Sequence, residues 1–363
     1  MGKAVFISII IIHGLIHLMG FAKSFGLLRI TELSQDISKP LGLLWLLSAI
    51  LFFSVGILYL SNKDWWWIPG IFAIILSLFL IVVFWQDAKF GIIPNIIILA
   101  AVVIGFALWN FDNQVDEEIK RILAVNNREA QVITEDMIQE MPDPVQRWLR
   151  NSGVIGKEKI HTVYLRQKGS MRLKPEQKGW MKADAEQYFT IDKPAFVWRV
   201  RTPVMGLPVV GRDIFRDGKG GMQIKLAGIV PVVNLADNPK LNEATLQRYL
   251  GEMIWFPTAA LSENIKWEPI DDYKAKATMS IGETTGSAIF YFNDEGELSR
   301  FVAYRYRDIS DPEPTEWVAK IKEYRYVNGI KIPSKLEASW MLDQGEFTWY
   351  RFDVYEVKYN ELE

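Results

Sequence analysis

The sequence predicts a membrane protein of two parts. Four transmembrane helices precede an α+β domain with a large, curved, half-barrel-like antiparallel sheet and one or two helices. Two observations favour this fold class. Apolar segments as long as a membrane span fill residues 1–110, and runs that alternate aromatic or β-branched residues with polar ones begin near residue 160. We therefore expect a membrane domain over residues 1–112, a helical linker over 113–155 and a soluble, strand-rich domain over 156–363.

The four expected spans are recognised by their length and apolar character, since about 20 helical residues cross a hydrocarbon core of about 30 Å. A signal peptide is the alternative interpretation of the first segment and fits it poorly, because no small-residue cleavage site follows it and three further spans come after it. Tryptophans flank the third and fourth segments, as is typical of the membrane interface. The expected spans cover residues 4–22, 41–60, 66–85 and 92–109.

The distribution of basic residues predicts the orientation. Positively charged residues favour the cytoplasmic side of a membrane. The first and third loops carry Lys23, Arg29, Lys39 and Lys89, whereas the N-terminal tail and the second loop carry Lys3 and Lys63. We therefore expect a multi-pass protein of the cell membrane whose soluble domain lies outside the cytoplasm.

Polar residues inside the expected spans are candidates for function, because it is costly to bury them in lipid. His13 and His17 are four residues apart and share one helix face. They are typical of a metal, haem or quinone site or of proton handling, or of a contact between helices. Two imidazoles are too few ligands for a typical metal site, so we predict no metal and no cofactor. At the fourth span, Asp87 and Lys89 are expected to form an interfacial pair, and Asn95 an interhelical hydrogen bond.

The second half of the chain combines a few helices with many strands. A charged helix is expected near residues 116–125, another from Asp143-Pro144 to Asn151, and a third over 243–253 with Asn242 as its N-cap. Turns are predicted at Asp217-Gly218, Gly282, 294–296 and 328–329. The candidate strands cover residues 161–173, 180–190, 196–204, 213–217, 221–226, 275–281, 284–292, 300–307, 318–327, 330–339 and 347–359.

Composition and motifs exclude several classes of function. The chain has no cysteine, so it has neither disulfides nor a thiol nucleophile. Its formal net charge is −2, and neither half carries the clustered positive charge that nucleic-acid binding needs. The sequence also lacks the motifs of serine hydrolases, zinc proteases, P-loop enzymes and dinucleotide-binding enzymes.

Several segments together resemble an uncharacterised family of bacterial multi-pass membrane proteins with a C-terminal strand-rich domain. The resemblance covers most of the chain and implies no particular activity. It is carried by residues 13–17 (HGLIH), 87–95, 211–215 (GRDIF) with 217–218 and 220–222, and 247–250 (QRYL) with Glu252 and 255–259 (WFPTA).

A second resemblance concerns the fold of the soluble domain. Residues 166–198, with Arg166-Gln167-Lys168-Gly169 at one end and Phe196-Val197-Trp198 at the other, are similar to periplasmic lipoprotein carriers of the LolA-like group. That group has a curved antiparallel half-barrel with a lidded apolar cavity that holds acyl chains. The resemblance implies a shape rather than an activity.

The best candidates for a functional cluster are Arg212, Asp213, Arg248, Glu252 and Trp255. Arg248 and Glu252 lie four apart on one expected helix, and Asp213 opens a strand whose next residues alternate into a core. We expect the four charged residues to gather where this helix meets the sheet. There they either hold the helix against the sheet or form a ligand-binding site. Trp255 either fills space in the core or covers a cavity.

The favoured function is a membrane-tethered, non-enzymatic domain that binds a lipid or another hydrophobic ligand in the concave side of its sheet. The eight tryptophans of residues 111–363 and the absence of catalytic motifs favour it. One alternative is an interaction or sensor protein that docks a partner protein on the sheet. The other is an enzyme that uses Asp213 and Glu252 as acid and base. A deep apolar cavity would favour the first, and a small polar cleft the last.

Overall fold

A computed structural model describes residues 2–124 and 130–361 of the chain. It divides into two compact units. One comprises Met1–Asn113 with Ala227–Ile229, and the other comprises Gln114–Leu226 with Val230–Glu363. We refer to them as the helical unit and the soluble unit, and each is described by itself.

The helical unit contains α1 (Lys3–Ser24), α2 (Lys39–Leu60), α3 (Trp67–Val83), α4 (Trp85–Ala88) and the first part of α5 (Ile92–Leu123). Three helical segments are long and apolar enough to cross a membrane, namely α1, α2 and the stretch Trp85–Leu123. The expectation of four such helices was wrong for residues 66–85. There α3 has only 17 residues, because Phe84 leaves the helical conformation. Such a helix is about 26 Å long, which is shorter than a typical hydrocarbon core.

Within the described residues, six α-helices precede the first strand, where four transmembrane helices were expected. Of the two beyond those spans, the single-turn α4 was not expected. The other, α6 (Asp143–Ser152), confirms the helix expected from Asp143 to Asn151 and ends at Gly153 in the left-handed conformation. Helix α5 continues without a break from its apolar part into the charged residues up to Leu123, because no glycine or proline interrupts it there.

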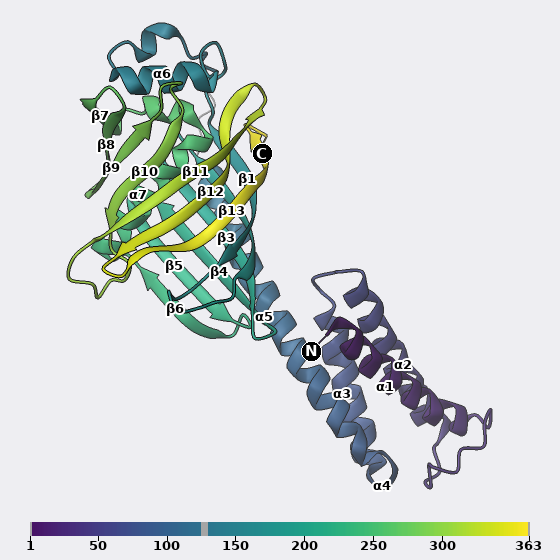
Figure 1. Ribbon diagram of the computed structural model, residues 1–363. Coiled ribbons are helices and arrows are strands. Elements are labelled where there is room, and N and C mark those ends of the chain that lie inside the picture. The colour runs from purple at the N-terminus through teal and green to yellow at the C-terminus, as the bar shows by residue number, and fades with distance from the viewer. Residues whose placement is uncertain (1, 125–129, 362–363) are drawn as a thin grey trace. The chain divides into compact units, whose positions relative to one another are not determined.

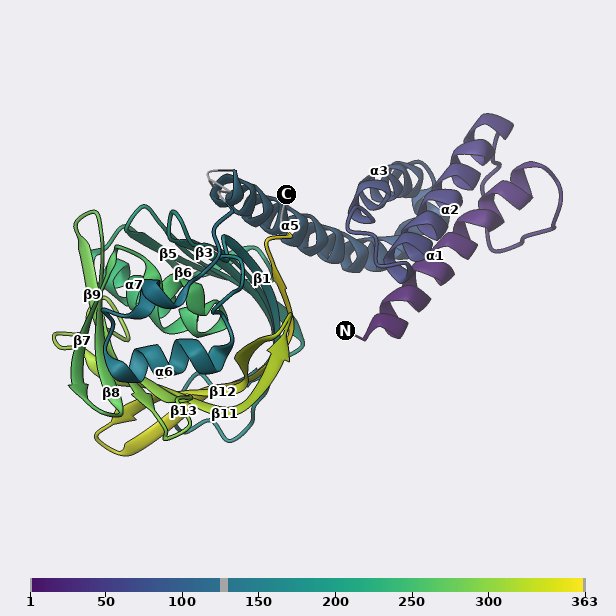
Figure 2. The same cartoon turned by 90° about the horizontal axis from the view of Figure 1, so that it is seen from above.

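The soluble unit is built on one antiparallel sheet, which Figure 2 shows as strongly curved. Its first arm contains β1 (Thr162–Met171), β2 (Met181–Thr190), β3 (Ala195–Val204), β4 (Leu207–Arg216), β5 (Lys219–Leu226) and β6 (Val230–Ala236). Its second arm contains β7 (Ile265–Asp271), β8 (Lys274–Ile281), β9 (Thr284–Phe292), β10 (Leu298–Arg305), β11 (Thr315–Val327), β12 (Ile330–Leu342) and β13 (Gly345–Tyr359). Strands β1 and β13 pair at the centre and join the two arms.

The two edges of this 13-stranded sheet are β6 and β7, and they are the strands that the sequence did not reveal. Each contains a proline, Pro231 in β6 and Pro269 in β7. Proline cannot donate to a strand ladder, so it is confined mainly to edge strands and hides the strand pattern. The predicted turn at Asn328-Gly329 is confirmed, with both residues at positive φ.

Helix α7 (Pro239–Glu252) connects the two edge strands and lies inside the curve of the sheet (Figures 1 and 2). It packs against β4 and β5 of one arm and β8, β9 and β10 of the other. Asn238 caps it, by accepting from the backbone N–H of Lys240, so the expected cap at Asn242 was wrong. Asn242 lies one turn further on and accepts from the backbone N–H of Gly220 at 2.7 Å. A side chain at Gly220 would lie 2.3 Å from Thr245 Oγ1, so β5 can approach α7 only with glycine there.

Candidate functional site

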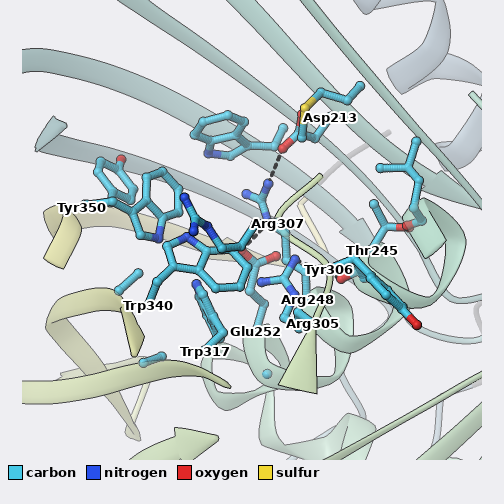
Figure 3. A pocket seen from close by; sticks show the side chains of 18 of the residues that line it. Asp213, Thr245, Arg248, Glu252, Arg305, Tyr306, Arg307, Trp317, Trp340 and Tyr350 are labelled. Atoms are coloured by element: carbon cyan, nitrogen blue, oxygen red, sulfur yellow. Dashed lines mark hydrogen bonds and ion pairs between the residues drawn. The ribbon is translucent and has the colours of Figure 1, made fainter. Parts of the chain in front are cut away.

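A cavity of about 360 Å³ lies between α7 and the concave face of the sheet (Figure 3). This volume falls in the range of about 300–1,000 Å³ that is common for ligand pockets. Four different strands each contribute a tryptophan to its wall, namely Trp198, Trp317, Trp340 and Trp349. Its other apolar lining residues include Met222, Val233, Leu235, Leu241, Ile254, Leu336, Ala338 and Phe352.

A charged cluster of Asp213, Arg248 and Glu252 forms part of the cavity wall. Arg248 Nη1 donates to Asp213 Oδ2 at 2.5 Å, and Arg248 Nε donates to Glu252 Oε1 at 2.8 Å. All three side chains are largely buried, and Gln187 Nε2 donates to the second oxygen of Glu252 at 2.6 Å. The guanidinium of Arg248 also lies over the ring of Trp198, 4.6 Å from its centre. One arginine therefore holds two carboxylates that come from β4 and from its own helix.

Burial dominates the protonation of this cluster. It raises the pKa of Asp213 and that of Glu252, although the neighbouring Arg248 acts against it in both cases. Burial also disfavours the charged form of Arg248, but the carboxylates of Glu252 and Asp213 outweigh it, so the pKa of Arg248 is raised. The arginine stays charged, and the two acids bind protons more readily than ordinary carboxyls.

Arg212, which we expected in the same cluster, lies elsewhere. Its Nε is 2.9 Å from Glu118 Oε2 in the last part of α5, and both side chains are largely buried. Adjacent residues of a strand point to opposite faces of a sheet, so Arg212 cannot share the concave face with Asp213. Arg199 of β3 pairs with Asp116 of α5 at 2.9 Å, although the side chain of Asp116 is about half exposed, and Arg199 also binds Glu186 of β2. These two ion pairs hold the charged end of α5 against the convex face.

Trp255 follows α7 and is almost fully buried. Its indole Nε1 donates to the backbone oxygen of Pro333 at 3.2 Å, and its own backbone oxygen accepts from Tyr359 Oη at 2.7 Å. Trp255 thus ties the end of α7 to β12 through its ring and to β13 through its backbone, and it also lines the cavity.

Sequence reasoning missed two arginines of the cavity wall. Arg305 ends β10, and its guanidinium lies over Trp317, 4.7 Å from the ring centre, while Arg305 Nη2 donates to the backbone oxygen of Ala244 at 2.9 Å. Arg307 lies over Trp340 at 5.9 Å. The alternation of the expected strand 300–307 was the available signal, since it places residues 305 and 307 on the face of the buried Phe301 and Ala303.

The polar candidates of the helical unit make hydrogen bonds within that unit. His13 Nε2 lies 3.0 Å from Asn95 Oδ1 and 3.3 Å from Ser77 Oγ, and Asn95 Nδ2 donates to Ser77 Oγ at 2.9 Å. His17 Nδ1 lies 2.9 Å from the backbone oxygen of His13. These four side chains are buried. Within the described residues, no group of three or more His, Cys, Asp or Glu side chains could hold a metal ion.

Asp87 makes different contacts from the expected pair with Lys89. Its two oxygens accept from Ser34 Oγ at 2.7 Å and from the backbone N–H of Gln35 at 3.0 Å. The loop between α1 and α2 supplies both donors, which satisfy the carboxylate without the lysine, and Lys89 Nζ instead lies over the ring of Phe90.

A family model, described as a family of unknown function (DUF6544), matches residues 131–352, which is more than half of the chain. The chain belongs to this family. The DUF6544 region contains every residue of the cavity wall named above, from Trp198 to Phe352. His13, Asp87 and Asn95 lie outside it. No curated protein matches the chain.

Two solved structures show a weak, fold-level likeness. A LolA superfamily protein from Nitrosomonas europaea matches with 11% identity and a TM-score of 0.35, over 60% of this chain and 94% of its own. A beta-barrel-like protein of a domain of unknown function, DUF1849, from Brucella abortus matches with 10% identity and a TM-score of 0.22, over 56% of this chain and 99% of its own. Both TM-scores are below 0.5, so neither match carries an argument about this chain.

Proposed function

We propose that the chain is a membrane-tethered module whose soluble unit binds a lipid or another hydrophobic ligand in the cavity beneath α7. The observation that carries the proposal is the cavity itself, about 360 Å³ in volume with a predominantly apolar wall. Side chains that face an empty space of this size lose the dispersion contacts of a packed interior. A ligand with an apolar body would restore these contacts.

The placement of α7 supports the proposal. The helix bridges the two arms of the sheet and keeps their concave faces apart, and Trp255 anchors its end. The charged cluster holds the helix to β4 on one side of the cavity. The fold therefore maintains the volume instead of closing it, as a pre-formed ligand pocket requires.

Mass spectrometry of the full chain, purified in lipid nanodiscs and then extracted with organic solvent, tests the proposal. We expect a small molecule at near-stoichiometric amounts that empty nanodiscs do not yield. Ala338→Trp places an indole inside the cavity and should remove this molecule. Thr285→Trp adds the same ring at an exposed position of β9 and should leave it bound. Recovery of folded wild-type protein with nothing bound would contradict the proposal.

The filled variant needs its own control, because an extra ring in a packed region costs about 1–3 kcal/mol. The thermal midpoint of Ala338→Trp is therefore measured alongside its ligand content. A variant that is still folded at the temperature of extraction but has lost the molecule supports occupancy of the cavity. A folded variant that keeps it would place the ligand elsewhere.

A second candidate is acid and base catalysis by Asp213 and Glu252. It is favoured by the fact that both carboxylates line the cavity and that burial raises the pKa of each. Arg248 already occupies one oxygen of each carboxylate, which suits a brace better than a reacting pair. If the recovered molecule is unchanged after prolonged incubation with excess protein, this candidate fails. Conversion that Asp213→Asn abolishes would favour it.

A further inference from the structure

The buried polar atoms of the cavity wall that lack a hydrogen-bond partner are all donors. Among the described residues, three buried side-chain nitrogens of this wall have no hydrogen-bond partner, and they are Arg305 Nε, Trp317 Nε1 and Trp349 Nε1. Each of them carries a hydrogen and can only donate. A buried donor without an acceptor costs about 1–3 kcal/mol. The buried atoms of the wall that lack a partner are therefore all donors.

The charges around the cavity point in the same direction. Asp213 and Glu252 share Arg248, and Asp308 turns its carboxylate to Ser310, whose Oγ donates at 2.6 Å. Neither Arg305 nor Arg307 forms an ion pair with an acidic side chain of the described residues, although the nearby carboxylates of Glu252 and Asp213, which Arg248 binds, favour the charged form of Arg305. Arg305 lies on the wall, and the exposed Arg307 lies two residues further along the chain (Figure 3). Two cations thus line the cavity without an ion-pair partner of their own among the described residues.

Arg305 is held in surroundings that disfavour its charge. Burial, and then the neighbouring Arg248, lower its pKa to about 10. An anion at the cavity end of the guanidinium would offset both effects. The guanidinium lies over the ring of Trp317, 4.7 Å from its centre, so these two side chains border the same part of the cavity.

We propose that the ligand of this cavity is an amphiphile with an apolar tail and an anionic head that only accepts hydrogen bonds, a carboxylate or a phosphate, and that Arg305, Arg307 and Trp317 bind this head. The inference rests on the proposed function and specifies its ligand. The tail packs on Leu241, Ile254 and Leu336, where the wall is apolar. A cationic head would meet two arginines, and a head with a hydroxyl or amine group would bring further donors to a wall already rich in them.

Photolabelling of the full chain in lipid nanodiscs tests the ligand class. The probe is dodecanoate with a diazirine in its tail, and peptides that contain cavity residues are identified by mass spectrometry. The competitors carry the same tail with different heads, and they are dodecanoate, dodecyl phosphate, methyl dodecanoate and dodecylamine. We expect the first two to suppress labelling at concentrations about tenfold lower than the neutral ester, since hydrogen bonds to charged groups are worth about that factor or more.

Variants locate the head. Arg305→Gln should abolish most of the preference for the anions over the ester. Arg307→Gln, at an exposed position where folding is not in question, should reduce it by a smaller factor. Arg300→Gln is the matched control. Arg300 lies on the same strand but is exposed, with its guanidinium 4.1 Å from the ring centre of Tyr291, and should preserve the preference.

The outcomes separate the two proposals. If methyl dodecanoate competes as well as dodecanoate, the inference about the head is overturned and the hydrophobic pocket stands. If dodecylamine competes best, the inference is overturned as well. If no cavity peptide is labelled above the level of Ala338→Trp, the pocket and the inference both fail. If the anions win, the ratio of dodecanoate to dodecyl phosphate tells whether a carboxylate or a phosphate is preferred.

Discussion

Two polar clusters in apolar surroundings, one in each unit, differ in charge and in what lies beside them. In the helical unit, His13, Ser77 and Asn95 bond to one another through neutral groups. In the soluble unit, Arg248 binds two buried carboxylates, and all three line a cavity. Both clusters can be recognised in the sequence, because their polar residues stand within apolar segments. The free volume beside the second cluster is what favours a ligand there, and a residue pattern cannot reveal it.

The comparison predicts that replacing one residue of the charged cluster lowers the free energy of unfolding more than replacing one residue of the neutral cluster. Arg248→Met leaves Asp213 and Glu252 buried without their counter-charge, and the free energy of unfolding should fall by about 3–5 kcal/mol. Thermal and chemical denaturation of the full chain, followed by tryptophan fluorescence, measures this effect. Arg300→Met, on the exposed face, should change it by no more than about 0.5 kcal/mol. Equal effects of the two variants would show that the cluster does not brace the fold.

The charged cluster should also make stability depend on pH. Burial raises the pKa of Glu252 above its ordinary value of 4.5. A carboxyl with a raised folded-state pKa contributes stability that is fully present below the unfolded pKa and is lost as the pH rises through the folded pKa. The free energy of unfolding should thus fall as the pH rises above about 4.5, by about 1.4 kcal/mol for each unit of displaced pKa. Glu252→Gln should flatten this fall.

An oppositely shifted acid provides the control. The hydrogen bond from Lys331 lowers the pKa of Glu297, so its contribution is present above its ordinary value of 4.5 and is lost on acidification. Glu297→Gln should therefore reduce the loss of stability at low pH and leave the fall at higher pH in place. A pH profile that Glu252→Gln leaves unaltered would mean that burial does not govern this carboxyl.

The neutral cluster should tolerate substitution better. Asn95→Leu removes the shared partner of His13 and Ser77, and hydrogen bonds between membrane helices contribute about 0.6 kcal/mol on average and at most about 1.7 kcal/mol. We expect a destabilisation within that range, measured by denaturation of the helical unit in the full chain. A loss as large as that of Arg248→Met would reverse the comparison and point to a functional role for His13.

The orientation of the protein in the membrane decides which compartment supplies the ligand. We propose that the soluble unit lies outside the cytoplasm, because the first and third loops carry more Lys and Arg than the tail and the second loop. A C-terminal alkaline phosphatase, which is active only in an oxidising compartment, should therefore be active. Fluorescence from a C-terminal reporter that matures only in the cytoplasm would contradict the proposal.

Much of the fold followed from local patterns. Most strands of the sheet's interior, the turn at Asn328-Gly329 and the apolar helices were predictable, because alternation, turn residues and run length are properties of neighbouring residues. Strand β4 was expected only from residue 213, although it begins at Leu207. The edge strands β6 and β7 were not, since proline masks them. The length of α3 was not either, because a helix can end inside an apolar run.

The site was predictable only in part, because local residue patterns reveal its charged cluster but not the packing of distant segments that forms the cavity. Asp213, Arg248 and Glu252 were singled out by strand position and by helical spacing, and they meet. Arg212 was misplaced because adjacent strand residues face opposite ways. Arg305 and Arg307 were overlooked because a charged residue at the end of a strand usually lies in solvent. The cavity depends on how far α7 holds the two arms apart, which is a long-range property that no short segment encodes.

The central claim is that the space beneath α7 is occupied by an apolar molecule. A high-resolution structure of the full chain, purified from its native membrane into nanodiscs and determined by electron cryo-microscopy, tests it most directly. We predict elongated density between Leu241 and Leu336, with its head against Arg305 and Trp317. A space filled by inward rotation of its own tryptophans, or one that holds only separate water molecules, would contradict the account.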